Sequence, residues 1–152
     1  MRHINKFEYI NIMVRISNLQ ILEALRQNSR TPFLELARRF GVSETAVRKR
    51  VRKLEEQGII RKYTIEMDPR KAGFQVGAIV GIDTEPDSYV ETMESLKKEG
   101  EIMCLSSCSG DHMIMAECWF RDREALSGFL KQMKGMKGVR KVCPAIIGER
   151  IK

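Results

Sequence analysis

No stretch of this 152-residue sequence stays apolar for the roughly 18–20 residues that a membrane-spanning helix requires, which argues against an integral membrane protein. The first residues mix Ile and Met with Arg, His, Lys and Glu and contain no compact apolar segment, so we expect no secretory signal and a cytoplasmic protein. Repeats and low-complexity segments are missing as well. With 43% hydrophobic and 31% charged residues, the composition is that of a folded globular protein.

Cysteine is scarce and is confined to the second half of the chain. No CxxC pair occurs, and the spacing is not that of a zinc motif; the four residues are Cys104, Cys108, Cys118 and Cys143. Cys104 and Cys108 are four apart in a segment with the pattern of a strand, so they would face the same side, with His112 near them in the sequence. A metal or redox site is therefore an alternative, but we favour buried free thiols.

Recognisable catalytic arrangements are also missing. The sequence has no Ser/His/Asp set, no paired carboxylates and no phosphate-binding loop. The only groups available for catalysis in the second half are Asp111, His112, Glu117 and the cysteines. We therefore expect neither an enzyme nor a resident cofactor or metal.

The net charge of +7 is unevenly distributed. Residues 1–63 contain 14 Lys and Arg against 6 Asp and Glu, whereas residues 64–152 contain 13 against 14. A basic first part joined to a nearly neutral second part is typical of a nucleic-acid-binding unit attached to a domain with another task. Sequence patterns divide the chain into an extension over 1–16, a DNA-binding domain over 17–64, a linker over 65–75 and a second domain over 76–152.

Three short helices are predicted in the DNA-binding domain. Ser17 or Asn18 can cap the first, and Thr31, before Pro32, is expected to cap a second helix over residues 33–40. Gly41 supplies the left-handed conformation of a tight turn, and Ser43 can cap a third helix that stops at Gly58. The spacing predicts a helix-turn-helix. The alternation of Tyr63, Ile65 and Met67 with polar residues predicts a strand over residues 59–68.

The third helix carries most of the functional information. Val47, Val51 and Leu54 form one buried stripe, and Lys and Arg occupy the remaining faces. Between Arg38 and Lys53 there are seven basic residues and one acidic residue, Glu44. Like charges on a helix repel one another unless a polyanion such as duplex DNA neutralises them.

Helix-turn-helix geometry separates two groups of contacts. The N-terminal part of the second helix of the motif enters the major groove and reaches base edges, which by spacing selects Ser43, Glu44, Thr45, Arg48, Lys49 and Arg52. Arg48 or Arg52 can make a bidentate contact with guanine, and Glu44 can accept from cytosine. The residues better placed for phosphate groups are Thr31, Arg38, Arg39 and Lys53.

The second domain alternates between strand and helix patterns. Strands are predicted over 76–83, 102–110, 112–120 and 139–151, and helices over 86–100 and 122–134. Ser109, Gly110 and Asp111 form a hairpin turn, and Pro144 places the last strand at an edge. The order β-α-β-β-α-β predicts a ferredoxin-like sandwich, so the complete fold is an α+β chain with an N-terminal (winged) helix-turn-helix.

These motifs resemble the Lrp/AsnC (feast/famine) transcription regulators. The matching features are the Ile21-Leu22 pair, L-A-x-x-x-G-V-S over 36–43, V-x-x-R-V-x-x-L-E-x-x-G-I-I over 47–60 and D-P-x-x-x-G over 68–73. The resemblance covers about residues 17–152 and is more specific in the first half. It implies a homodimer formed through the sandwich sheets, often assembled into tetramers or octamers.

The resemblance also implies an effector, usually an amino acid, bound near the turn between the second and third strands of the sandwich. The matching positions are Ser109, Gly110, Asp111, His112 and Met113. Backbone N–H groups around the glycine can hold a carboxylate, and Asp111 can take an ammonium group. The family loop usually reads G-D-aromatic-D, whereas this chain has His112 and Met113 in the last two places, so the effector can differ, be apolar or be missing. A plain hairpin turn is the alternative.

Two further functions stay open. The same fold can serve as an effector-independent architectural DNA-binding protein that compacts DNA around an oligomer. RNA binding is less favoured, because the sandwich strands offer only Trp119 and Phe120 for base stacking.

Overall fold

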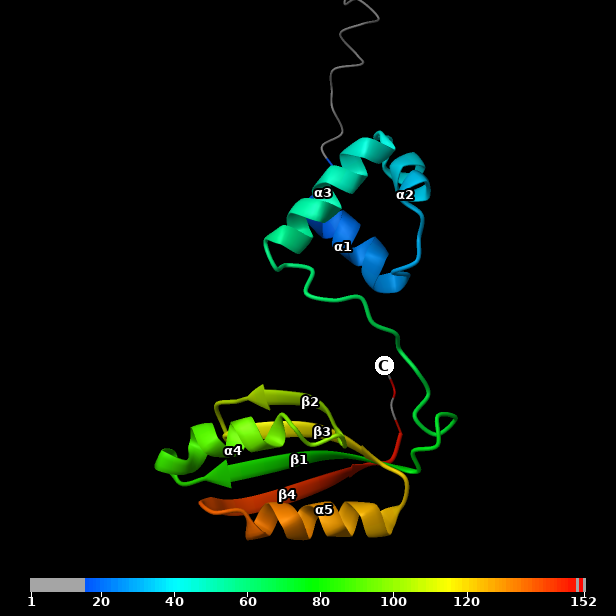
Figure 1. Ribbon diagram of the computed structural model, residues 1–152. Coiled ribbons are helices and arrows are strands. Elements are labelled where there is room, and N and C mark those ends of the chain that lie inside the picture. The colour runs from blue at the N-terminus through cyan, green and yellow to red at the C-terminus, as the bar shows by residue number, and fades with distance from the viewer. Residues whose placement is uncertain (1–15, 150, 152) are drawn as a thin grey trace, which may run out of the picture. The chain divides into compact units, whose positions relative to one another are not determined.

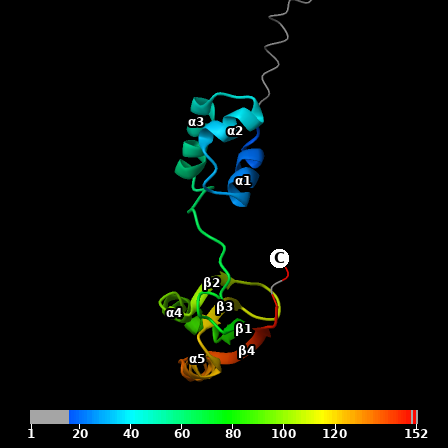
Figure 2. The same cartoon turned by 90° about the vertical axis from the view of Figure 1, so that its right-hand side faces the viewer.

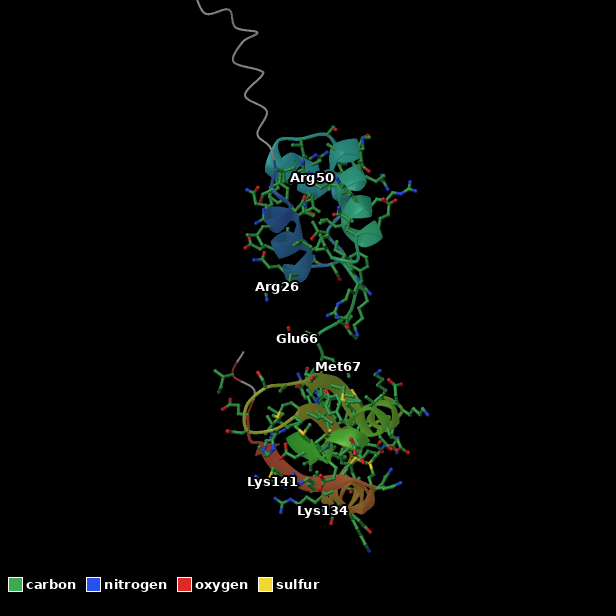
Figure 3. All side chains as sticks on the ribbon, turned by 90° about the vertical axis from the view of Figure 1, so that its left-hand side faces the viewer. Arg26, Arg50, Glu66, Met67, Lys134 and Lys141 are labelled. Carbon is green, nitrogen blue, oxygen red and sulfur yellow. The ribbon has the colours of Figure 1, made fainter. Side chains whose placement is uncertain are left out.

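In a computed structural model of the chain, residues 16–149 and 151 can be described, and they form two compact units. The division falls between Glu66 and Met67, both of which are labelled in Figure 3. The predicted extension lies outside the described residues except for Ile16, which is 4% exposed and belongs to the core of the first unit. Among the described helices, none is both long and apolar enough to cross a membrane.

The first unit consists of three helices, α1 (Asn18–Gln27), α2 (Phe33–Phe40) and α3 (Glu44–Glu56) (Figure 1). Ser17 caps α1 through a reciprocal pair of bonds with Gln20, as its position in the sequence predicts. The core is formed by buried side chains of all three helices, Ile16, Ile21, Ala24, Leu25, Leu36, Ala37, Val47, Val51 and Leu54. Val47, Val51 and Leu54 of α3 are at most 1% exposed, so the predicted buried stripe of this helix is confirmed.

The turn between α2 and α3 also follows the prediction. Gly41 ends α2 in the left-handed region with φ of 66°, where a side chain would be strained. The Ser43 hydroxyl accepts the backbone N–H of Ala46 at 3.2 Å and caps α3. Because both ends of the turn are fixed locally, the basic helix begins at a defined residue.

The prediction that Thr31 caps α2 is wrong. Pro32 occupies the cap position, and its carbonyl accepts the N–H groups of Glu35 and Leu36 at 2.9 and 3.1 Å. The Thr31 hydroxyl instead donates to the Asn28 carbonyl at 2.8 Å and closes the preceding turn. A proline can take this place because its φ is already close to the required value.

The predicted strand over residues 59–68 is also wrong. The segment is extended, but it belongs to no sheet, and Ile65 is 74% exposed. Its start is held by α3, because Ile59 and Ile60 donate to the Leu54 carbonyl and Tyr63 Oη donates to Glu55 at 2.7 Å. An alternating segment becomes a strand only when a second strand pairs with it, and no described segment does so.

The second unit is a four-stranded antiparallel sheet with the order β2-β3-β1-β4 (Figures 1 and 2). Its strands are β1 (Val76–Thr84), β2 (Ile102–Ser107), β3 (Ile114–Phe120) and β4 (Val139–Ile147). A 3-10 turn over Pro86–Ser88 leads into α4 (Tyr89–Leu96), and α5 (Arg123–Gly135) joins β3 to β4. The β-α-β-β-α-β order is confirmed, and β4 with Pro144 is an edge strand.

Both helices of this unit cover one face of the sheet. The core contains alternate residues of β1 and β3 together with Leu96 of α4 and Phe129 and Met133 of α5. Four of the six predicted elements are too long, whereas the strand predicted over 76–83 and the helix predicted over 122–134 agree with β1 and α5 to within one residue. The last strand ends at Ile147 because its partner in the ladder, Gly77, is next to the first residue of β1. The helix predicted over 86–100 ends at Leu96, and turns follow it as far as Gly100.

Candidate nucleic-acid and effector sites

The basic face of the first unit is formed by α2 and α3. Five cationic side chains on these helices make no ion pair with any described residue: Arg38, Arg39, Lys49, Arg50 and Lys53. Four of them are exposed and Arg50, labelled in Figure 3, is half-buried. The stem of Arg39 places its guanidinium 5.5 Å from the centre of the Phe40 ring. The face therefore carries positive charge that the protein itself leaves uncompensated.

Two of the predicted base-reading residues contact each other. An Arg48 guanidinium nitrogen bonds to the Glu44 carboxylate one turn earlier, and the same guanidinium lies 5.2 Å from the centre of the Phe33 ring. Their side chains are 62% and 40% exposed, so the pair is accessible to solvent. Surface pairs of this spacing contribute only about 0.3–0.5 kcal/mol, so contact with a nucleic acid can separate them.

Arg52 also has a partner that the sequence analysis did not consider. Its Nε donates to Glu56 Oε1 at 2.9 Å along the exposed side of α3. Thr45 is exposed near the start of α3, whereas the hydroxyls of Ser43 and Thr31 are engaged as described above. The structure thus brings the predicted residues of α2 and α3 onto one unit, with three of them in intrahelical ion pairs.

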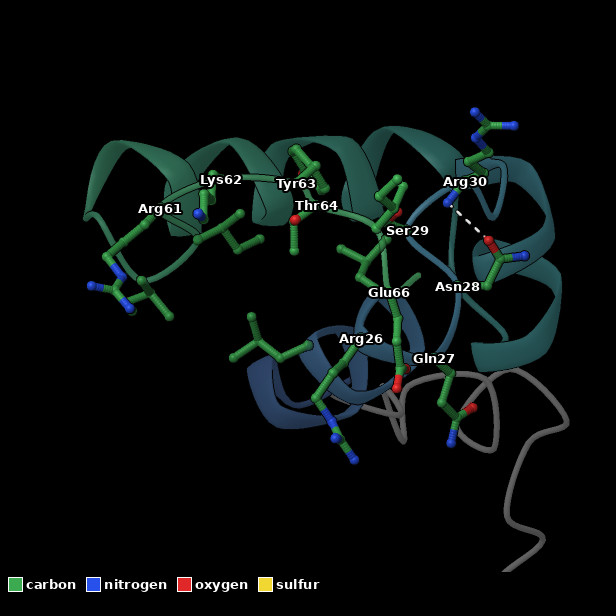
Figure 4. A pocket seen from close by; sticks show the side chains of 15 residues that line it. Arg26, Gln27, Asn28, Ser29, Arg30, Arg61, Lys62, Tyr63, Thr64 and Glu66 are labelled. Carbon is green, nitrogen blue, oxygen red and sulfur yellow. Dashed lines mark hydrogen bonds between the residues drawn. The ribbon is translucent and has the colours of Figure 1, made fainter. Parts of the chain in front are cut away.

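A pocket of about 910 Å³ lies elsewhere on this unit (Figure 4). It is lined by the end of α1, the turn after it and the extended segment after α3, with four cations among the lining residues: Arg26, Arg30, Arg61 and Lys62. The Asn28 side chain holds the turn by accepting the Arg30 N–H at 3.0 Å. Burial, with the bond to Glu55, raises the pKa of Tyr63 to about 12. A strand over residues 59–68 would leave no such pocket, so the sequence pattern gives no signal for it.

The predicted effector residues form the hairpin between β2 and β3. The backbone N–H of Cys108 donates to the Met113 carbonyl at 2.9 Å, and Gly110 has a φ of 134°, which only glycine adopts easily. Ser109, Gly110 and Asp111 are exposed, while His112 and Met113 are half-buried. The five residues are therefore adjacent in space as well as in sequence.

A carboxylate that the sequence analysis missed holds this turn. Asp83 of β1 accepts the Met113 N–H at 3.0 Å and lies 2.9 Å from Nδ1 of His112. The bond from His112 chiefly, then that from the Met113 amide and the charge of Lys141, hold the pKa of the Asp83 carboxyl below its ordinary range. The only sequence signal for it was a charged residue near the end of an apolar strand.

The expectation of buried free thiols is correct only for Cys118, because Cys104 and Cys108 are exposed and Cys143 is half-buried. Strand β2 ends at Ser107, so Cys108 lies outside it, and the prediction that Cys104 and Cys108 share a strand face is wrong. Cys118 is buried in the core, and burial raises the pKa of its thiol to about 12. Within residues 16–149 and 151, no three His, Cys, Asp or Glu side chains are grouped to hold a metal ion.

The second face of the sheet is not covered by α4 or α5. Ile79 in the middle of β1 is 39% exposed there, between Glu117 of β3 and Ala145 of β4. The other residues that alternate onto this face include Gly77, Met115, Trp119, Cys143 and Ile147. An apolar sheet face of this kind is suited to association with another protein surface.

Comparison with known proteins agrees with these features. Residues 15–61 match the family model described as winged helix-turn-helix DNA-binding, and residues 77–152 match the one described as Lrp/AsnC ligand binding domain. The HTH-type transcriptional regulator LrpA of Pyrococcus horikoshii is 50% identical over 87% of this chain and 94% of its own. LrpA1 of Halobacterium salinarum is 36% identical over 88% and 94%. The structure of AsnC from E. coli covers 90% of this chain and 95% of its own with a TM-score of 0.78 and 29% identity.

Proposed function

The chain belongs to the Lrp/AsnC family of helix-turn-helix transcription regulators, and from that membership we propose that it reads specific duplex sites through α2 and α3. Members of this family are transcription regulators and not enzymes. The observation that carries the proposal is the uncompensated basic face, because five cations without an ion pair to any described residue are suited to phosphate groups. The regulator acts in the cytoplasm, where its DNA target lies.

We assign two kinds of contact on this face. Arg48, Lys49 and Arg52, with Ser43, Glu44 and Thr45, read base edges, whereas Arg38, Arg39 and Lys53 hold phosphate groups. The phosphate contact predicted for Thr31 is not retained, because its hydroxyl and its backbone N–H both donate to the Asn28 carbonyl. The Glu44–Arg48 pair supports a readout in which Arg48 leaves its intrahelical partner for guanine and Glu44 becomes free to accept from cytosine. Separating the pair costs little because both side chains are already exposed.

Gel-shift titration against the upstream region of the protein's own gene tests this proposal. We expect tight binding to one or a few sites with a steep salt dependence, and equal affinity for unrelated duplexes of the same length would contradict specific regulation. Arg48→Ala should relax base preference, while Lys53→Ala should weaken binding to all duplexes about equally.

The β2–β3 turn is the proposed effector site, formed by Ser109, Gly110, Asp111, His112 and Met113. The Gly110 backbone is suited to a carboxylate, and Asp111, exposed and without an ion pair to any described residue, is suited to an ammonium group. An amino acid has both groups. A thermal-shift screen against the standard L-amino acids tests the assignment, because a ligand that binds only the folded state raises the melting temperature.

We further propose that the uncovered sheet face forms a homodimer, which assembles into a tetramer or octamer. Exposed Ile79 and its apolar neighbours on this face support the proposal. In a symmetric dimer the face would pack against its own copy. Light scattering gives the mass in solution, and Ile79→Lys should shift it towards the monomer; an unchanged mass would place the interface elsewhere.

An architectural role is the second candidate. Arg48 pairs with Glu44, and Arg52 pairs with Glu56. These pairs favour an architectural role, because an arginine that stays bound to a glutamate is not available to contact a base. Binding would then depend on phosphate groups alone, and the gel shift above would give equal affinities for unrelated duplexes.

A further inference from the structure

The conformation of the β2–β3 turn depends on a side chain outside it. Asp83 is near the end of β1, and its two carboxylate oxygens have different partners, Oδ1 the Met113 amide and Oδ2 the His112 ring. The Asp83 and His112 side chains are only 22% and 18% exposed. One carboxylate therefore fixes both the backbone of the turn and the direction of the ring.

The chemistry of the pair determines where the His112 proton lies. The pKa of the Asp83 carboxyl is lowered, so at neutral pH it is ionised and only accepts hydrogen bonds. Nδ1 must then carry a proton to complete the bond. In the neutral ring this leaves Nε2 without one, as a hydrogen-bond acceptor.

Gly81 provides the space for this arrangement. A Cβ atom added to Gly81 would overlap the His112 ring, whereas one added to Gly77, four residues earlier on the same face, would meet Ile147 Cδ1 at an ordinary 3.4 Å. Across the ladders, Gly81 pairs with Met115 of β3 and Cys143 of β4. The charged residue that β4 places beside Asp83 is Lys141, which also favours the ionised carboxylate.

We propose that Asp83 is the positioning residue of the effector turn: it holds His112 with Nδ1 protonated, so that Nε2 is presented as an acceptor to the ammonium group of an amino acid. The inference rests on the proposed effector site. Besides Asp111, His112 would then be a second group that binds the ammonium. It would replace the carboxylate that the family loop usually has at the position of Met113. Gly81 is required because only glycine leaves room for the ring.

Ring ¹⁵N chemical shifts of His112 test the role of Asp83 without any ligand. The chain has two histidines, so His3→Gln assigns the signals of the full-length protein. At pH 8 we expect the Nδ1–H form in this background and with Gly77→Ala added as the matched control. Adding Asp83→Ala or Gly81→Ala should shift the ring towards the Nε2–H form. An Nε2–H ring in the parent, or an unchanged tautomer in both variants, would overturn the proposal.

A second experiment measures the binding of each standard L-amino acid separately. We expect an amino acid that stabilises the wild type and Gly77→Ala to bind Asp83→Ala and Gly81→Ala about tenfold more weakly or worse, with DNA affinity in its absence unchanged. Equal affinity for all four proteins would refute the positioning role. If no amino acid stabilises the wild type, the proposed effector fails, while the tautomer still decides whether Asp83 holds the ring.

Discussion

The salt dependence of DNA binding is the most direct measure of the basic face. Counterion release gives a slope of log affinity against log salt of about 0.9 for each phosphate group neutralised. Five cations on α2 and α3 have no ion pair with a described residue. On a duplex without an operator, where Lys49 makes no base contact and all five are available to phosphate groups, one helix-turn-helix unit should contribute a slope of about −4.5. Raising salt from about 50 to 200 mM should then weaken binding by about 500-fold per unit.

Two substitutions should move this slope in opposite directions. Lys53→Gln removes one exposed cation from α3 and should reduce its magnitude by about 0.9. Glu44→Gln removes the partner of Arg48, which then becomes available to a phosphate group, and should increase the magnitude by up to about 0.9 on a duplex without an operator. Lys131→Gln, an exposed position on α5, is the matched control and should leave the slope unchanged.

Fluorescence anisotropy with a labelled duplex at several salt concentrations measures these slopes. A magnitude below about 2 for the wild-type unit would show that most of the five cations do not meet phosphate groups. A slope that stays unchanged in Lys53→Gln, as it should in Lys131→Gln, would place the DNA outside α3. Either result would refute the assignment of the basic face.

Three further predictions concern stability and ionisation. Leu54→Ala, at a position 1% exposed, should lower the free energy of unfolding by about 2–5 kcal/mol in urea titrations followed by circular dichroism. Folding lowers the pKa of the Asp83 carboxyl, so the stabilisation from its ionised form should be complete above the ordinary pKa range of Asp and should be lost as pH falls through the pKa of the folded state. His112→Phe removes the main cause of this lowering, so the melting temperature should begin to fall at a higher pH. Because folding raises the pKa of Tyr63 to about 12, stability should be lost as pH rises from about 10 to 12, and Tyr63→Phe should remove that part of the loss in melting curves.

Local signals explain why the first unit was predictable. The left-handed turn at Gly41, the cap at Ser43 and the stripe at Val47, Val51 and Leu54 all depend on residues within one or two helical turns. The order of helices and strands along the second unit was predictable for the same reason, because alternation and hairpin signals are local. The strand predicted over residues 59–68 failed because strand formation depends on a pairing partner, about which a single segment carries no information.

The sequence by itself determined that a basic helix follows a short turn and that a hairpin with Gly110 joins two strands. Both features depend only on residue type and on spacing along the chain. Only the tertiary structure decided which carboxylate holds this hairpin. It brought Asp83 of β1 to His112 and Met113, about 30 residues away in the chain. Hydrogen bonds between distant segments depend on the register of β1 against β3. This register is fixed by the packing of the whole sheet, because a shift by one residue would turn the buried side chains to the other face.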